Sequence, residues 1–308
     1  MPIPAASPAG PTVSVVIPAM NEAANLLHVL PRIPAWVHEL ILVDGASTDG
    51  TAEVARALWP GVRVVGQERR GKGVALRAGF AAATGDIVVM LDADGSMDPA
   101  EIGAYVDALL AGADFAKGTR FAKGGGTDDI TALRRLGNAG LTWLVRRLHG
   151  GGFSDLCYGY AAFWRRVLPT LALTSDGFEI ETEMNLRALR GGLRVEEVPS
   201  FEAARIHGAS NLNTFRDGWR VLATVLRETR TPTAMARQAR EATSGGAGDS
   251  ARRGGRHGAG PPRGAAAPAA GAEPPVAVVA GAALPRPAVA DDPTEQYAHA
   301  TTSFVSLG

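Results

Sequence analysis

The sequence has a single cysteine, no long apolar run and no excess of positive charge, so it lacks the features expected of disulfide-bonded, membrane-spanning and nucleic-acid-binding proteins respectively. Cys157 is the single cysteine among 308 residues, which excludes an internal disulfide and a zinc site built from cysteines. No apolar run approaches the roughly 20 residues that a membrane-spanning helix requires. Lys plus Arg and Asp plus Glu both total 31, so the formal net charge is zero and nothing draws the whole chain to nucleic acid. We therefore expect no nucleic-acid partner.

The N-terminus also lacks the pattern of a signal peptide. Residues 1–11 are rich in Pro and Ala, without a basic start followed by an apolar core. We expect a flexible N-terminus over residues 1–11. We also expect a cytoplasmic protein, whose membrane contact, where it has any, is peripheral at the inner face of the cell membrane.

The composition divides the remaining chain into two parts. Hydrophobic residues make up 46% of the sequence, enough for one sizeable core. Over residues 12–230, short β-branched runs alternate with helical patterns, which predicts a single α/β domain with a mostly parallel central sheet. Residues 231–308 are rich in Ala, Gly, Pro and Arg, and such a composition buries too little apolar surface to offset the entropy of ordering. We interpret them as a disordered C-terminal tail.

Acidic residues follow two of the strands predicted in the first half of the domain. These strands are expected at residues 13–17, 40–43, 62–65 and 86–91, with helices opening near Asn21, Thr48 and Gly71. Asp44 follows the second strand and Asp92 follows the fourth. Open α/β sheets bind ligands at the carboxyl ends of their strands, so both carboxylates are expected at a ligand site.

Asp92-Ala93-Asp94 is a candidate metal site. In an extended chain the side chains of residues i and i+2 point the same way, so Asp92 and Asp94 could share one cation. Mg²⁺ or Mn²⁺ suits such a pair, because these ions take few protein ligands and leave positions for diphosphate oxygens. The alternative is a simple turn, since Asp-Gly pairs such as Asp94-Gly95 are common turn formers.

Four motifs in order resemble the signature of family 2 glycosyltransferases, and the resemblance covers about residues 13–230. They are Val13-Ser-Val-Val-Ile-Pro-Ala-Met-Asn-Glu22, Val43-Asp-Gly-Ala-Ser-Thr-Asp-Gly-Thr51, Gly71-Lys-Gly73 and Leu91-Asp-Ala-Asp-Gly-Ser96. The chain is most similar to the branch of dolichyl-phosphate mannose synthases. This resemblance implies a GT-A fold, a Rossmann-like domain that binds a nucleotide diphosphate sugar.

The resemblance implies an inverting, metal-dependent transfer of a hexose. The expected donor is GDP-mannose or UDP-glucose, and the expected acceptor is a polyprenyl phosphate. Two alternatives stay open. One is the same chemistry on a soluble small-molecule or glycan acceptor, and the other is a non-catalytic protein that binds a sugar nucleotide.

The resemblance assigns several residues to the nucleotide sugar. They are Pro18, Asn21, Glu22, Asp44, Lys72, Asp92, Ala93, Arg120, Arg205 and Ser210. Asp44 would read the base, but Gly45 stands where many relatives have a second Asp, which leaves uracil and guanine open. Asp92 and Asp94 would hold the cation that offsets charge on the leaving nucleotide. His207, between Arg205 and Ser210, is a candidate metal or diphosphate ligand, and its alternative is a structural histidine.

Carboxylates in the second half are candidates for catalysis beside Asp94. Asp155 matches the segment placed near the sugar or the acceptor, and a tight turn explains it equally well. An alcohol acceptor would need a base, for which Glu179 or Glu181 is the choice, whereas a phosphate acceptor needs none. Both glutamates could instead complement the positive N-terminus of a helix.

Two late helices carry apolar residues at helical spacing. In the helix at about 131–149 we interpret the apolar side as core-packed beside a solvated basic flank, and the alternative is a surface that meets anionic lipid. We interpret the later helix as structural, closing the domain. Its apolar residues are Phe215, Trp219, Leu222, Val225 and Leu226.

Overall fold

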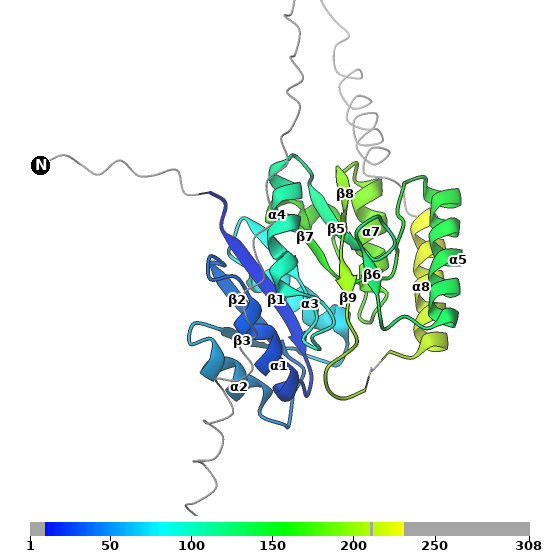
Figure 1. The fold of residues 1–308 in the computed structure, drawn as a ribbon. Coiled ribbons are helices and arrows are strands. Elements are labelled where there is room, and N and C mark those ends of the chain that lie inside the picture. Colours follow the sequence, from blue (N-terminus) through cyan, green and yellow to red (C-terminus); the bar gives the residue numbers. More distant parts are fainter. Residues whose placement is uncertain (1–9, 210–211, 231–308) are drawn as a thin grey trace, which may run out of the picture. The chain divides into compact units, whose positions relative to one another are not determined.

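A seven-stranded sheet forms the centre of the described chain, in the order β3-β2-β1-β4-β7-β5-β8 (Figure 1). The computed structural model describes residues 10–209 and 212–230, so the predicted tail and nearly all of the predicted N-terminal segment lie outside it. The strands are β1 Val13–Ala19, β2 Glu39–Asp44, β3 Arg63–Gly66, β4 Ile87–Met90, β5 Phe115–Thr119, β7 Ala161–Trp164 and β8 Val195–Pro199. Two further strands, β6 Gly126–Thr127 and β9 Phe201–Glu202, pair with each other.

The predicted α/β fold with a mostly parallel sheet is confirmed. Strand β1 runs parallel to β2 and β4, β2 runs parallel to β3, and β5 runs parallel to β8. Strand β7 is the exception, because it is antiparallel to both of its neighbours, β4 and β5. The four strands predicted in the first half are all present, within two residues at their ends.

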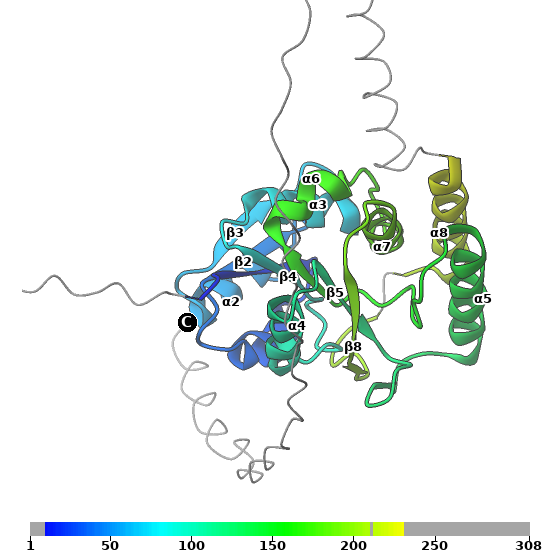
Figure 2. The same cartoon turned by 90° about the horizontal axis from the view of Figure 1, so that it is seen from above.

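Helices cover both faces of the sheet (Figures 1 and 2). Helices α1, α2 and α4 pack on one face, and α3, α6 and α7 pack on the other. Helices α5 and α8 lie side by side and both contact α7. The helices are α1 Ala23–Val29, α2 Thr51–Leu58, α3 Lys72–Ala82, α4 Ile102–Leu110, α5 Ala132–His149, α6 Leu168–Leu171, α7 Ile180–Arg190 and α8 Thr214–Arg230, with short 3₁₀ turns at Leu30–Arg32, Pro99–Glu101 and Arg165–Val167.

Strand β4 is apolar along its whole length, and β1 is apolar except for Ser14, because both faces of these strands are covered. In β1, Val15 and Ile17 join the cluster under α1 and α4, whereas Val16 joins the cluster under α3 and α7. This double burial fixes the strand ends, and with them the positions of the residues that follow.

The start of α2 corrects one detail of the prediction. The helix begins at Thr51, after Gly50 in a left-handed conformation (φ 85°), and no side chain caps it. Asp49 instead accepts hydrogen bonds from the Thr51 backbone N–H and hydroxyl.

The interpretation of α5 and α8 as core-packed helices holds for one side of each only. Val145 of α5 and Val225 of α8 are fully buried, but Leu136 of α5 and Phe215 and Trp219 of α8 are more than 70% exposed. The reason is geometric, since one side of each helix packs in a cluster with α7 and no described element covers the other side. Within residues 10–209 and 212–230, no helix combines the length and the apolar character needed to cross a bilayer.

Two glycine substitutions test the packing of α3 on the sheet. A methyl group at Gly79 in α3 would overlap the side chains of Val16 and Val43, whereas one at Gly140 in α5 would have no neighbour within 4 Å. We expect Gly79→Ala to lower the free energy of unfolding by about 1–3 kcal/mol through overpacking. Gly140→Ala should raise it by about 0.5–1 kcal/mol through helix propensity. Urea unfolding followed by circular dichroism measures both, and shifts of the same sign would contradict this packing.

Candidate active site

A pocket of about 680 Å³ lies where the carboxyl ends of β1, β2 and β4 meet, the edge that the sequence predicted. It extends from there to the first turns of α5 and α8. Most of the predicted site residues line it, and these are Pro18, Glu22, Lys72, Asp92, Ala93, Asp94, Arg120, Glu181 and Arg205. The predicted residues that do not line it are Asn21, Asp44, Asp155, Glu179 and His207, and Ser210 falls outside the described residues.

Lys72 is the centre of a buried ion cluster on the inner wall. Its Nζ lies 2.7 Å from the Asp92 carboxylate and 2.6 Å from Glu181 Oε1. Burial alone would lower the pKa of Lys72, but the charges of Asp92 and Glu181 and the hydrogen bonds to them outweigh it, so the pKa is raised. Lys72 therefore stays an ammonium and joins the start of α3, the exit of β4 and α7.

Glu181 is the predicted base that reaches the pocket. Burial raises its pKa, the charge of Lys72 opposes that rise, and the negative charge of Asp92 adds to it. Any side chain at Gly159 would overlap the Glu181 carboxylate, so this glycine leaves the room that the glutamate needs. Glu179 lies outside the pocket wall, where its Oε1 accepts a hydrogen bond from the Gly177 backbone N–H (3.1 Å).

Arg205 links Asp94 to the loop after β1. Its Nη1 lies 2.9 Å from Glu22 Oε1, and its Nη2 lies 3.4 Å from Asp94 Oδ2. The other oxygen of Asp94, Oδ1, accepts hydrogen bonds from the Ser96 backbone N–H (3.0 Å) and hydroxyl (2.7 Å). The carboxylate of Asp94 is thus oriented from both sides.

The carboxylates of this cluster fit a divalent cation. Among the described residues, four carboxylates pair with two cations, Lys72 and Arg205, and these carboxylates are Glu22, Asp92, Asp94 and Glu181. The side chains of Asp92 and Asp94 are 26% and 19% exposed, and both line the pocket. Such a pair suits Mg²⁺ or Mn²⁺, whose remaining ligands would be water and diphosphate oxygens.

The prediction of His207 as a metal or diphosphate ligand stays a prediction, and the contacts of its loop are as follows. No group of three or more His, Cys, Asp or Glu side chains that could hold a metal occurs in the described part of the chain. The Asn25 side chain binds both the backbone N–H (2.9 Å) and the carbonyl (3.1 Å) of His207. The imidazole ring packs 5.5 Å from the ring of His28. His207 therefore holds its loop against α1.

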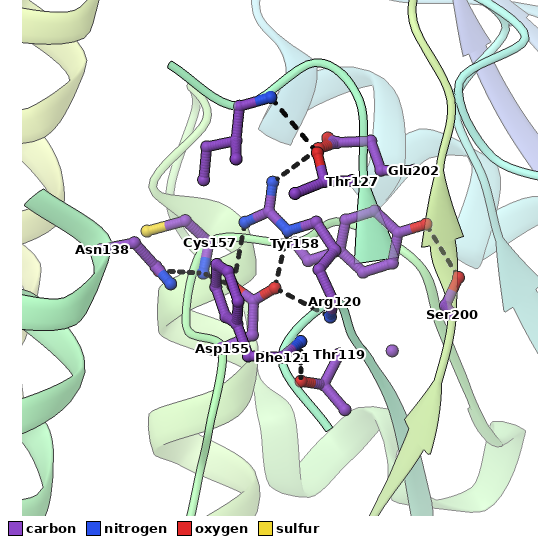
Figure 3. Close-up of polar contacts among 12 residues, drawn as sticks. Thr119, Arg120, Phe121, Thr127, Asn138, Asp155, Cys157, Tyr158, Ser200 and Glu202 are labelled. Carbon is purple, nitrogen blue, oxygen red and sulfur yellow. Dashed lines mark hydrogen bonds and ion pairs between the residues drawn. The ribbon is translucent and has the colours of Figure 1, made fainter. Parts of the chain in front are cut away.

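Arg120 belongs to a second buried cluster in the pocket wall (Figure 3). Its Nε lies 2.7 Å from Asp155 Oδ2, its Nη1 lies 2.9 Å from Glu202 Oε2, and its guanidinium lies 5.0 Å from the centre of the Tyr158 ring. Asp155 is fully buried behind Arg120. Burial would raise the pKa of Asp155, but the hydrogen bonds and charge of Arg120, with the charge of Lys117, hold it below its usual value.

Sequence reasoning missed Glu202 and Lys117, which belong to no recognised motif. Glu202 lies on β9, 82 residues from Arg120, and only the fold brings the two together. Lys117 is buried in β5, where its Nζ donates to the Gly118 carbonyl (2.7 Å). Neither residue lies in a local sequence pattern that would have identified it as part of the pocket wall.

The loops after β1 and β2 are tied to each other beside the pocket. Asn21, which adopts φ 58°, accepts a hydrogen bond from the Thr48 backbone N–H through its Oδ1 (2.8 Å), so it is not a helix cap. Asp44 Oδ2 accepts a hydrogen bond from the Ser47 backbone N–H (3.3 Å). The other oxygen, Oδ1, is buried without a hydrogen-bond partner among the described residues.

Sequence comparisons show that this chain is similar to known glycosyltransferases. The family model described as Glycosyl transferase family 2 matches residues 14–171. Glycosyltransferase AglJ of Haloferax volcanii is 34% identical over 230 residues, which cover 73% of this chain and 74% of that protein. Polyprenol monophosphomannose synthase of Mycolicibacterium smegmatis is 34% identical over 213 residues, covering 65% of this chain and 80% of that one.

A solved structure with the same fold comes from Mycobacterium tuberculosis. It is glucosyl-3-phosphoglycerate synthase in complex with phosphoglyceric acid, with a TM-score of 0.59 and 28% identity, covering 73% of this chain and 82% of that chain. A second structure of that synthase, in complex with Mn²⁺, UDP and glucosyl-3-phosphoglycerate, matches with a TM-score of 0.55 and 30% identity, covering 73% of this chain and 82% of that chain.

Removal of Arg120 tests the buried pair with Asp155. Arg120→Met leaves a buried carboxylate unpaired, so we expect it to lower the free energy of unfolding at pH 7 by about 3–5 kcal/mol. Arg32→Met, which breaks an exposed pair with Asp98, is the control and should cost less than about 1 kcal/mol.

The loss in Arg120→Met should depend on pH. The lowered pKa of Asp155 means that its stabilisation is present above its ordinary value of 3.8 and is lost as the pH falls through the folded-state value. The stability gap between the wild type and Arg120→Met, measured by urea unfolding, should therefore narrow as the pH falls below 3.8. A gap that stays constant or widens would show that Asp155 is not held ionised by Arg120.

Proposed function

The chain belongs to glycosyl transferase family 2, and from this premise we propose that it transfers mannose or glucose from a nucleotide diphosphate to a polyprenyl phosphate, with inversion. We further propose that the transfer depends on Mg²⁺ or Mn²⁺ bound by Asp92 and Asp94. The observation that carries the proposal is the shared pocket. Asp92, Asp94 and Lys72 line one end of it, and arginines from α5 and α8 line the other.

The loops after β1 and β2 support the proposed nucleotide site. Pro18 and Glu22 line the pocket there, and Asn21 holds the two loops together. The unpaired Oδ1 of Asp44 supports its predicted role, because a buried acceptor without a partner is costly and a base N–H is a donor that could satisfy it. Gly45 leaves both GDP-mannose and UDP-glucose as candidate donors.

The leaving group is a nucleotide diphosphate, on which negative charge builds as the glycosidic bond breaks. A bound Mg²⁺ or Mn²⁺ supplies Lewis-acid stabilisation of that charge. Asp92 and Asp94 would hold the ion, while Lys72 and Ser96 fix the orientations of these two carboxylates. Arg205, held by Glu22, offers further N–H donors to diphosphate oxygens at this end of the pocket.

The acceptor end of the pocket favours an anion. Arg134, Arg216 and Arg220 line it together with Asp129 and Asp217. A phosphate acceptor arrives already ionised and needs no base, so Glu181 would then serve to hold Lys72. An alcohol acceptor would require a carboxylate to take its proton, and Glu181 is the predicted base that lines the pocket.

A soluble phosphorylated acceptor is the second candidate. The observation that favours it is the likeness to the synthase solved with phosphoglyceric acid, a small anion. The basic acceptor end fits the phosphate of either molecule, so the two candidates differ in the rest of the acceptor. A non-catalytic protein that only binds the sugar nucleotide would show no turnover with any acceptor.

Removal of one carboxylate tests the proposed metal site. We expect Mn²⁺ to strengthen the binding of UDP or GDP to the wild type, and Asp94→Asn to weaken this metal-dependent binding by about 10-fold to 100-fold in calorimetry. Turnover should fall by about 100-fold or more. Asp129→Asn is the matched control, because Asp129 lines the same pocket at its other end and should leave the effect of Mn²⁺ intact. Full turnover of the wild type in excess chelator would overturn the proposal.

Labelling of lipid tests the proposed acceptor. The protein is incubated with a polyprenyl phosphate and either radiolabelled GDP-mannose or UDP-glucose, and the organic phase is counted. We expect label in the organic phase with one of the two donors, because a phosphate carried on a polyprenyl chain partitions there. Label confined to the aqueous phase when phosphorylated small molecules are supplied would establish the second candidate instead.

A further inference from the structure

Helix α8 carries a line of large apolar residues on its exposed side. Phe215, Trp219 and Leu226 recur at intervals of four and seven residues, so they share one side of the helix. Their exposed fractions are 73%, 71% and 46%. This is unusual for residues that could have been buried in the domain core.

Helix α5 carries a matching line. Leu133, Leu136 and Trp143 recur at intervals of three and seven residues and are 55%, 73% and 66% exposed. We call these three residues and the three of α8 the outer face.

Apart from Leu133, which also lines the pocket, the residues of the two lines lie on the sides of the helices that are turned away from the domain. Val145 of α5 and Val221 and Val225 of α8 pack in one cluster with Leu186 of α7, and on each helix these residues lie on a different side from the exposed line. Helices α5 and α8 lie side by side with α7 on their inner side in both views (Figures 1 and 2). The outer face is therefore a surface of two neighbouring helices.

Arginines supply the exposed charge on both helices. The described exposed charged side chains are Arg135, Arg146 and Arg147 on α5 and Arg216, Arg220 and Arg227 on α8. Helix α5 contains no acidic residue, and the acids of α8, Asp217 and Glu228, are buried in ion pairs. Among the described residues, the exposed charged side chains of these two helices are thus all cationic.

We propose that the outer face docks on a bilayer that contains anionic lipids. Aromatic and aliphatic side chains on one side of a helix with arginines beside them are the composition of helices that lie in the membrane interface. Anionic headgroups complement the arginines. A second copy of this chain fits less well, since a two-fold interface would bring the arginines of α5 and α8 against each other, and the described residues of these helices include no exposed acid to pair with them.

Docking would bring the acceptor end of the pocket to the lipid surface. Leu133 and Arg134 at the start of α5 and Thr214 and Arg216 at the start of α8 line that end of the pocket. This part of the inference rests on the proposed function, because it makes a membrane-borne phosphate the acceptor. The docking itself requires no turnover.

Vesicle flotation tests the docking with the full chain and without any nucleotide. We expect binding to vesicles of phosphatidylglycerol and phosphatidylcholine at least 10-fold stronger than binding to phosphatidylcholine alone, with a loss in high salt. The double variant Trp143→Ser/Trp219→Ser should weaken binding by at least 10-fold, and Arg135→Glu/Arg147→Glu should do the same. Trp36→Ser is the matched control, since Trp36 is 53% exposed and lies outside both helices, and it should bind like the wild type.

Two further measurements keep the test decisive. Mn²⁺-dependent binding of UDP or GDP, measured in the same variants, should stay unchanged, which shows that they fold and separates failure of docking from failure of the proposed function. Equal binding to both kinds of vesicle would overturn the inference. So would a dimer, seen by light scattering, that the tryptophan double variant abolishes while vesicle binding persists.

Discussion

The site depends on one buried ammonium group, that of Lys72, which Asp92 and Glu181 share. A lysine so deeply buried keeps its charge only because two carboxylates lie within 2.7 Å of it, and either carboxylate alone in that position would be costly. Lys72 thereby connects α3, the exit of β4 and α7. The approach is close because glycines stand at Gly73 and Gly159, where a side chain would overlap the Ser175 carbonyl or Glu181.

The charges of the pocket divide it into two ends with different chemistry. At the exits of β1 and β4, carboxylates outnumber cations, which suits a divalent ion and the diphosphate that would complete its ligands. At the starts of α5 and α8, arginines outnumber acids, which suits an acceptor that carries phosphate. Arg120 lies in the wall with its charge held by Asp155 and Glu202, so it shapes the pocket as part of a rigid cluster.

The features that depend on neighbouring residues in the sequence, such as the strands and helices, could be predicted. Strand β4 is apolar because both of its faces are covered, and this makes the position of Asp92 and Asp94 at its exit predictable without coordinates. The pairing of Arg120 with Glu202 was not predictable, since it depends on β9, which pairs with β6, returning after 82 residues to the residue that follows β5. Periodicity predicted α5 and α8 as helices, but it could not tell whether Leu136 and Trp219 would find a packing partner. The contact between the Asn25 side chain and the backbone of His207 could not be predicted either, because the two residues lie 182 positions apart in the sequence.

The central claim is that Asp92 and Asp94 hold the cation that steadies the departing diphosphate. Crystals grown with Mn²⁺ and UDP or GDP, with anomalous data collected at the manganese edge, test it most directly. If these carboxylates hold the cation, one strong anomalous peak should lie about 2.1 Å from a carboxylate oxygen of Asp92 or Asp94 and from diphosphate oxygens. A nucleotide bound in the pocket with manganese far from both carboxylates, or with none at all, would contradict it.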